Sequence, residues 1–246
     1  FECTLAGRSV PCWAPIRVSA GSRLKIGGTA TGCRGYLAIG GGIAVAPVLG
    51  SRSQDVNSRI GPLNGQPLAN GARLPLGTAP APGVKNAGWS LAAPCWKAPV
   101  RPLILPLMPA THTDCLDAAS RRTLFEHTFR IGQNSNRVGC RLESHALKLK
   151  QSLEMISAAV LPGTVQLPPS GTPIAMLCEA PVTGGYPRIG HIAQLDLTRL
   201  AQLKPGDEVR FTPVTVDKAQ QQYLQREREL RALQAHIAKR RTGTWP

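Results

Sequence analysis

Short extended runs separated by proline and glycine make up residues 161–197, and this pattern restricts the fold more than any other part of the sequence. We expect strands at residues 164–167 and 174–178 and a further extended run at residues 188–197. A loop at residues 180–187 separates the last two runs. Apolar runs this short, bounded by turn residues, are typical of strands. The stretch therefore predicts a strand–loop–strand frame.

The loop at residues 180–187 has the composition of a binding loop. Gly184 and Gly185 lie between the hydroxyl-bearing residues Thr183 and Tyr186. Glycine reaches backbone conformations that are closed to other residues, and without a Cβ atom it lets a ligand approach the main chain. A loop on a rigid frame is a common place for a site. The alternative is a glycine-rich hairpin turn with no ligand.

Turn residues are frequent in the rest of the chain, whose 246 residues include 25 glycines and 22 prolines. Between them, alternating or β-branched runs predict strands at residues 15–20, 23–27, 33–39, 101–108, 124–131 and 209–216. Apolar residues at helical spacing predict a long helix at residues 216–241, and a shorter helix is expected at residues 196–203. Residues 77–94, rich in Ala, Gly and Pro, are the best linker candidate.

The bulk composition narrows the class of protein. A net charge of +15 would suit a nucleic-acid or acidic partner, but 4% aromatic residues are too few for a base-stacking surface, so no nucleic-acid partner is expected. No apolar run approaches the roughly 18 residues of a membrane span. Seven scattered cysteines without a CxxC pair favour reduced, buried thiols in a cytoplasmic protein. Because the chain starts at Phe1 without a recognisable leader, we expect its natural N-terminal segment to be missing.

Two charged groups outside the glycine loop are candidates for the site. Arg137 and Arg141 flank Gly139, and such a pair of arginines suits carboxylate or phosphate recognition. The alternative is a structural arginine that pairs with a nearby acid such as Glu143. Glu179, at the mouth of the loop, is the best candidate for a general base or a substrate-orienting acid, or else it caps the loop through backbone N–H groups.

No metal site is expected. His112, Asp114 and Cys115 share one short loop, but no second pair of ligands at a defined spacing accompanies them. A surface loop is therefore the favoured interpretation.

Taken together, these motifs resemble the signature of the KipA family, which also comprises the C subunit of 5-oxoprolinase, allophanate hydrolase subunit 2 and the biotin-dependent carboxyltransferases. The residues that carry the resemblance are Pro162, Gly163, Gln166, Pro168, Gly171, Pro173, Ile174, Thr183 to Pro187, Gln202, Pro205, Gly206 and Asp207. The GSRS loop at Gly50–Ser53 and the arginines at 137 and 141 also resemble the family pattern, with departures at Val138, Cys140, Ala180 and Val182.

The resemblance implies a mainly β (α+β) fold, a cyclophilin-like β-barrel with a C-terminal helix. We expect an N-terminal β subdomain at residues 1–80, incomplete at its start. Residues 98–216 would form the part of the barrel that carries the signature loops, and residues 217–246 a basic helical extension.

The resemblance also implies a function. The chain would be the C subunit of a heteromeric 5-oxoprolinase that, with an A subunit and a KipI-like B subunit, uses ATP to open the lactam of 5-oxoproline to glutamate. One alternative is a carboxyltransferase-type protein that acts on urea- or allophanate-like amides, with biotin supplied by another protein. The other is a KipA-type regulator that antagonises a KipI-like partner.

Within this function we expect the following site residues. Glu179, Thr183 and Tyr186 are the catalytic candidates. The candidates for binding substrate or anion are Arg137, Arg141, Gln166, Gly184, Gly185, Ser51 and Arg52.

Overall fold

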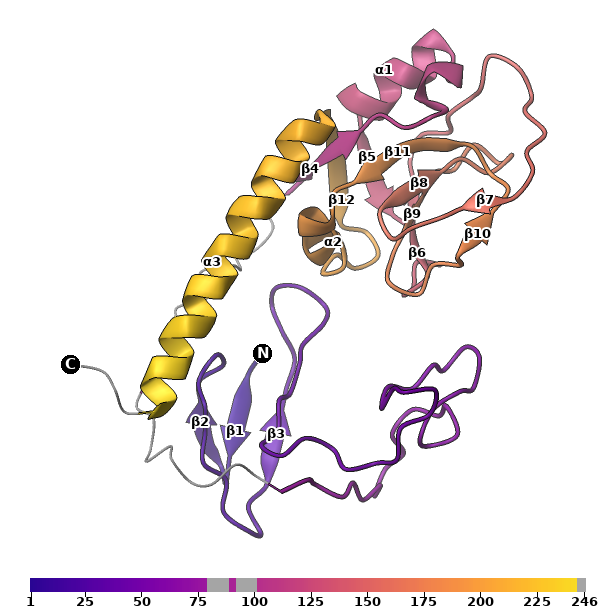
Figure 1. Cartoon of the computed structure of the whole chain (residues 1–246). Coiled ribbons are helices and arrows are strands. Elements are labelled where there is room, and N and C mark those ends of the chain that lie inside the picture. Colours follow the sequence, from indigo (N-terminus) through magenta and orange to yellow (C-terminus); the bar gives the residue numbers. More distant parts are fainter. Residues whose placement is uncertain (79–88, 92–100, 243–246) are drawn as a thin grey trace. The chain divides into compact units, whose positions relative to one another are not determined.

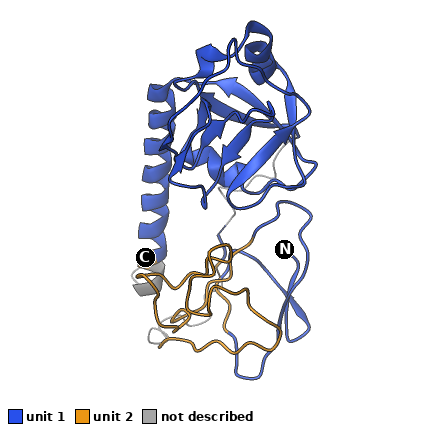
Figure 2. Cartoon of the chain, turned by 90° about the vertical axis from the view of Figure 1, so that its right-hand side faces the viewer, with its two compact units in different colours: residues 1–14, 18–34, 90–237 blue, residues 15–17, 35–89, 238–246 orange. Residues whose placement is uncertain are grey.

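The computed structural model describes residues 1–78, 89–91 and 101–242, and the chain divides into two compact units (Figure 2). Unit 1 comprises residues 1–14, 18–34 and 90–237, and unit 2 comprises residues 15–17, 35–89 and 238–246. Most of the linker expected at residues 77–94 lies outside the described residues. The three segments expected from the resemblance, 1–80, 98–216 and 217–246, stay a prediction.

Seven strands of the described residues of unit 1 close into a barrel (Figure 1). Around the barrel they follow the order β11-β4-β12-β5-β6-β9-β8. The β4–β12 pair is parallel and the remaining pairs are antiparallel. The strands are β4 (Leu103–Met108), β5 (Thr128–Ile131), β6 (Gly139–Glu143), β8 (Thr164–Gln166), β9 (Ile174–Met176), β11 (Arg188–Ile192) and β12 (Glu208–Pro213). The expected mainly β barrel is confirmed.

Side-chain alternation along the strands fills the barrel. In β4, Leu103, Leu105 and Leu107 are buried, whereas Ile104 between them is 42% exposed. Successive strand residues point to opposite faces, so three leucines enter the core while their neighbours face outward. The largest buried side chains beside them include Phe129, Ile131, Leu142, Ile189, Ile192 and Phe211.

The expected strand at residues 124–131 is wrong over its first four residues. Helix α1 (Ala118–Glu126) continues to Glu126, and β5 begins only at Thr128. Asp117 caps the helix by accepting a hydrogen bond of 2.6 Å from the backbone N–H of Ser120. Leu124 is fully buried, because α1 packs against β12. Tertiary packing and a helix cap thus override the local alternation of apolar residues.

The expected strands at residues 15–20 and 33–39 are absent from the described structure. Unit 1 contains a small sheet of β1 (Cys3–Leu5), β2 (Arg8–Val10) and β3 (Leu24–Ile26), the last of which matches the expected strand at 23–27. Elsewhere, Val18 is 54% exposed and Leu37 is 57% exposed. Without a buried face or a partner strand, a β-branched run does not form a strand.

Two signature motifs near the C-terminal end of the barrel have structural roles. Helix α2 (Gln194–Leu200) precedes Gln202, whose side-chain oxygen accepts hydrogen bonds of 3.0 Å from the backbone N–H groups of both Cys33 and Arg34. Asp207 is nearly buried, pairs with Arg101 at 2.9 Å and accepts the N–H of Lys204 at 2.9 Å. Both side chains therefore fasten loops of unit 1 together.

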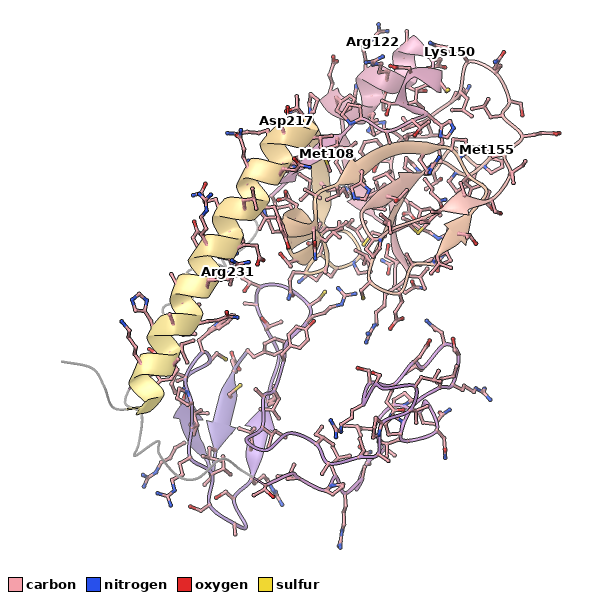
Figure 3. The ribbon with its side chains drawn as sticks, viewed as in Figure 1. Met108, Arg122, Lys150, Met155, Asp217 and Arg231 are labelled. Carbon is pink, nitrogen blue, oxygen red and sulfur yellow. The ribbon has the colours of Figure 1, made fainter. Side chains whose placement is uncertain are left out.

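Helix α3 (Val216–Thr242) confirms the long helix expected from the periodicity. Figure 3 shows the labelled side chains of Asp217 and Arg231 projecting from it. Arg226 interrupts the apolar spacing, and it is partly buried and lies 3.5 Å from the carboxylate of Glu229. An arginine can occupy an otherwise apolar row because its long stem packs while its head keeps a charged partner.

The expectation of buried thiols holds for one described cysteine. Cys140 is 4% exposed, and this burial raises the pKa of its thiol to about 11. Cys3 and Cys115 are half-buried, and Cys12, Cys33 and Cys178 are exposed. All six are free thiols.

Gly163, in the turn before β8, gives a test of the barrel closure. Its φ is +99°, and an alanine Cβ there would overlap the main-chain carbonyl oxygen of Ile192 in β11. Gly206 has a φ of +88°, but an added Cβ would meet nothing within 4 Å. We expect both alanine substitutions to lose about 1–2 kcal/mol of unfolding free energy through the left-handed backbone. Gly163→Ala should lose roughly 1–3 kcal/mol more through overpacking.

Urea denaturation of the two variants measures the difference. Equal losses would show that the carbonyl of Ile192 moves aside without cost, contrary to a tightly closed barrel.

Candidate functional site

The glycine loop forms half of a two-stranded ribbon. Strand β10 (Thr183–Gly184) pairs antiparallel with β7 (Ala158–Ala159), and we call this pair the ribbon. The backbone N–H of Val160 donates to the carbonyl of Val182 at 2.9 Å and extends it. Figure 1 shows the two strands side by side. The loop is thus not a hairpin turn on itself, because its partner lies about two dozen residues earlier in the chain.

Gly184 lies in a close approach, and its backbone angles do not call for a glycine. Neither Gly184 nor Gly185 has a positive φ. A Cβ on Gly184 would lie 2.6 Å from Nε2 of Gln166 and 3.1 Å from a methyl group of Val160. A Cβ on Gly185 would meet only ordinary contacts, the nearest being the carbonyl oxygen of Met155 at 3.5 Å. The structure therefore brings together two of the predicted site residues, Gly184 and Gln166.

Gln166 lies on the outer face of the barrel wall and is nevertheless only 2% exposed. Its neighbours Val165 and Leu167 belong to the hydrophobic core inside the barrel. Alternation along the strand directs Gln166 to the opposite face, where Gly184 of the ribbon covers it.

A β-bulge in β11 places Arg188 opposite Gln166. The register pairs Arg188 with Gln166 and Gly190 with Val165, so Ile189 is an extra residue. Such a residue locally disrupts the ladder of hydrogen bonds. The buried hydroxyl of Thr113 compensates by donating to the carbonyl of Ile189 at 2.8 Å. Directly opposed residues point to the same face, so Arg188 and Gln166 both lie on the outer side of the wall.

Two buried donors at this place have no acceptor among the described residues: Nε2 of Gln166 and Nε of Arg188. Another nitrogen of the same guanidinium, Nη1, donates to the carbonyl of Ala159 in β7 at 3.4 Å. An unsatisfied buried donor costs about 1–3 kcal/mol, and more when the group is charged. Two such donors on opposed residues are the clearest chemical feature of this side of the barrel.

Arg188 was not among the residues singled out from the sequence. The available sequence signal is its position directly after the TGGYP motif. Its alignment with Gln166 on the neighbouring strand comes from the fold. The bulge that sets this alignment has no signature in the sequence.

His112 holds the backbone of Arg188 from the other side. Nδ1 of its ring accepts the backbone N–H of Arg188 at 3.1 Å, and the backbone N–H of His112 donates to the carbonyl of Arg188 at 3.0 Å. Burial, followed by the charge of Arg188, lowers the pKa of His112 from its ordinary value. The neutral ring, with its hydrogen on Nε2, is the form that fits this contact. Burial also lowers the pKa of His191.

Two of the predicted charged residues, Arg137 and Glu179, pair with one another. Nε of Arg137 lies 2.6 Å from the carboxylate of Glu179, and the backbone N–H of Glu179 donates to the carbonyl of Arg137 at 3.1 Å. The structural alternative for Arg137 is therefore observed with Glu179 in place of Glu143. The carboxylate proposed as a base is already engaged by an arginine.

The remaining candidates are dispersed. Arg141, Thr183 and Tyr186 are exposed. Ser51 and Arg52 belong to unit 2, where the hydroxyl of Ser51 accepts the N–H of Ser53 and Nε of Arg52 donates to the carbonyl of Val45, both at 3.0 Å. The roles expected for these five residues stay predictions.

Across the described ranges, no three or more His, Cys, Asp or Glu side chains gather closely enough to hold a metal ion. The same residues include no helix with the length and apolar character needed to cross a membrane.

The low pKa of His112 predicts a stability that depends on pH. The unfolded chain, with an ordinary histidine pKa of about 6.5, takes up the proton more readily than the folded chain. The free energy of unfolding is therefore complete above that value and falls as the pH drops below it. We expect the loss between pH 7.5 and pH 5.5 to be smaller in His112→Asn, whose amide oxygen keeps an acceptor but does not titrate.

Urea denaturation at both pH values measures this. His191 should leave a residual slope in both proteins, and identical slopes would contradict the assignment to His112.

The Arg137–Glu179 pair predicts a small coupling energy. The side chains are 63% and 23% exposed, and exposed ion pairs contribute about 0.2–1 kcal/mol. A double-mutant cycle with Arg137→Gln and Glu179→Gln should give a coupling in this range. It should exceed that of the control pair Arg130–Glu208, which is separated by 3.6 Å and whose carboxylate side chain is more exposed, at 42%. A coupling energy no larger than that of the control pair would show that Arg137 and Glu179 do not hold their two segments of the chain together.

Comparison with known proteins places this arrangement in a family. Residues 1–213 match the family described as carboxyltransferase domain, subdomain A and B. The chain is 35% identical over 204 residues to the C subunit of 5-oxoprolinase from Escherichia coli (strain K12), covering 83% of this chain and 64% of that protein. It is 32% identical over 221 residues to the Haemophilus influenzae protein of the same name, covering 89% of this chain and 68% of that protein.

A solved structure agrees. The urea carboxylase of Kluyveromyces lactis superposes with a TM-score of 0.79 at 27% identity, covering 89% of this chain and 21% of that chain. The chain thus spans about two thirds of the bacterial relatives and a much smaller part of the fungal enzyme. A match over most of its length shows that the chain belongs to the carboxyltransferase domain, subdomain A and B, family.

Proposed function

We propose that this chain is the C subunit of a heteromeric, cytoplasmic 5-oxoprolinase. With an A subunit and a KipI-like B subunit, it would open the lactam of 5-oxoproline to glutamate at the expense of ATP. The observation that carries the proposal is the 35% identity over 204 residues to a protein named as the C subunit of 5-oxoprolinase. The buried, unpartnered amide donor of Gln166 supports it, because a lactam presents a carbonyl oxygen that such a donor can bind.

The chemistry needs groups that hold the lactam carbonyl in place and stabilise negative charge at the reacting centre. Opening the lactam is coupled to ATP, so 5-oxoproline, ATP and two waters give glutamate, ADP and phosphate. Phosphorylation of the carbonyl oxygen activates the amide carbon toward water. One water adds to this carbon and the C–N bond breaks, and a second water hydrolyses the resulting acyl phosphate to glutamate and phosphate. Preorganised N–H donors stabilise the negative charge that these steps place on the oxygens at the reacting carbon. Gln166 beside Gly184 supplies a donor of this kind.

ATP is part of this proposal, and one common sequence motif for binding it can be checked on this chain. The sequence contains no GxxxxGK[ST] phosphate-binding loop. We therefore assign no residue of this chain to the nucleotide and expect one of the other subunits to hold it.

A carboxyltransferase acting on urea-like amides is the second candidate, and the TM-score of 0.79 to a urea carboxylase favours it. Biotin would supply the carboxyl group in that case and would arrive on another protein. The ureido oxygen of biotin is a hydrogen-bond acceptor, so the free amide donor of Gln166 fits it. In both candidates the same donor meets a carbonyl of an amide or urea.

Reconstitution tests the proposal. The full-length natural chain, co-expressed with the A and B subunits, should release glutamate from 5-oxoproline only when ATP and all three proteins are present. Urea-dependent carboxylation with a biotinylated carrier, and no glutamate release, would replace the first function by the second.

Gly184→Ala tests the position of the ribbon within this reaction. The added Cβ would push the Gln166 amide aside, and losing such a hydrogen bond costs about 1–3 kcal/mol, or about 10- to 100-fold in kcat/KM. Gly28→Ala is the control, because a Cβ there meets nothing within 4 Å. Unchanged turnover in Gly184→Ala, with the control also unchanged, would remove the ribbon from the site.

A further inference from the structure

Gln166 and Arg188 are opposed residues of β8 and β11 that share the outer face of the barrel wall. Both retain a buried N–H that finds no acceptor within the described part of the chain. Native proteins pair nearly all buried donors, so two unpaired neighbours call for an explanation. A ligand that brings acceptor atoms to both is the explanation that accounts for their adjacency.

The electrostatics indicate the sign of that ligand. None of the ion pairs formed among the described residues includes Arg188, whereas Arg101, Arg121, Arg130, Arg137, Arg199 and Arg226 each lie near a carboxylate. The positive charge of Arg188 also helps to lower the pKa of His112, so the neighbouring imidazole gains no charge of its own near neutral pH. A partly buried guanidinium without a carboxylate partner suits a ligand that carries one.

We propose that Gln166 and Arg188 form a subsite, covered by the ribbon, for a small molecule that bears both a carboxylate and an amide carbonyl. Arg188 binds the carboxylate and Gln166 donates to the carbonyl oxygen. In the proposed function, on which the identity of the ligand rests, these are the carboxylate and the lactam carbonyl of 5-oxoproline. The subsite thereby distinguishes this substrate from urea, which has the carbonyl but no carboxylate.

Entry requires the ribbon to move. The two donor atoms are buried, and the ribbon contributes both the Gly184 backbone against Gln166 and the Ala159 carbonyl that accepts from Arg188. Each of its strands has two residues, and so short a pair opens easily. The Arg188 contact to Ala159 is long, at 3.4 Å, so an incoming carboxylate can replace it.

Direct binding to the full-length chain, in the assembled complex without ATP, tests the subsite. Calorimetry would compare 5-oxoproline with 2-pyrrolidinone, which lacks the carboxylate, and with cyclopentanecarboxylate, which lacks the amide. We expect 5-oxoproline to bind most tightly. Arg188→Met should weaken it about 10- to 100-fold while leaving 2-pyrrolidinone unaffected. Gln166→Met should weaken both lactams and leave cyclopentanecarboxylate unaffected.

Stability supplies a second readout. Because an apolar side chain has no donor to leave unpaired, Gln166→Met and Arg188→Met should keep or raise the Tm of the unliganded chain while weakening binding. When 5-oxoproline is added, hydrogen exchange at residues 158–160 and 182–184 should slow in the wild-type protein. The same addition should leave exchange in Arg188→Met unchanged. A lowered Tm with unchanged binding in both variants would show that the donors serve the fold through buried water, and would overturn the proposal.

The outcomes separate this proposal from the proposed function. Glutamate release with an unchanged KM for 5-oxoproline in Arg188→Met would overturn the subsite and leave the function standing. Arg188-dependent binding of cyclopentanecarboxylate without any glutamate release would support the subsite and remove the function.

Discussion

The antiparallel pairing of β8 with β11 closes the barrel, and the other features of this side of the protein depend on it. Closure leaves no unpaired sheet edge in the barrel. The bulge at Ile189 lets the wall keep a fully buried isoleucine inside while Arg188 lies outside, opposite Gln166. The side chains of His112 and Thr113 then hydrogen-bond to the backbone N–H of Arg188 and the carbonyl of Ile189 at the bulge. These bonds hold the loop that follows β4 against β11.

The ribbon converts an outer wall into a buried polar environment. A glutamine on the outer face of a barrel would ordinarily meet water, and water would satisfy its amide. Here Gly184 approaches so closely that Gln166 is nearly inaccessible. Burying the Gln166 amide without an acceptor is unfavourable, and packing elsewhere in the fold offsets this cost. Positions at which a protein breaks such a local rule, without a visible structural gain, are commonly functional sites.

Much of the fold follows from local patterns. Turn residues bound β8 and β9 near the expected positions, and apolar spacing locates α3 to within one residue at its C-terminal end. The extended run expected at residues 188–197 is wrong after Ile192, because helix α2 begins at Gln194. The same local reasoning fails at residues 124–126, where an alternating pattern lies in a helix capped by Asp117, and at residues 15–20 and 33–39, which find no partner strand. The motifs identify Gln166 and Gly184, but they assign special backbone angles to a glycine that needs only the absence of a side chain.

By itself, the sequence determined the short strands, the long helix and the group of residues from which the site is built, because these depend on turn chemistry and on side-chain period over a few residues. Only the tertiary structure decided which of those residues meet. The ribbon joins segments about two dozen residues apart, Arg137 selects Glu179 in place of Glu143, and Arg188 aligns with Gln166 through a bulge. Pairings of this kind depend on the closure of the whole barrel, and a single extra residue in one strand changes the face on which every following side chain lies.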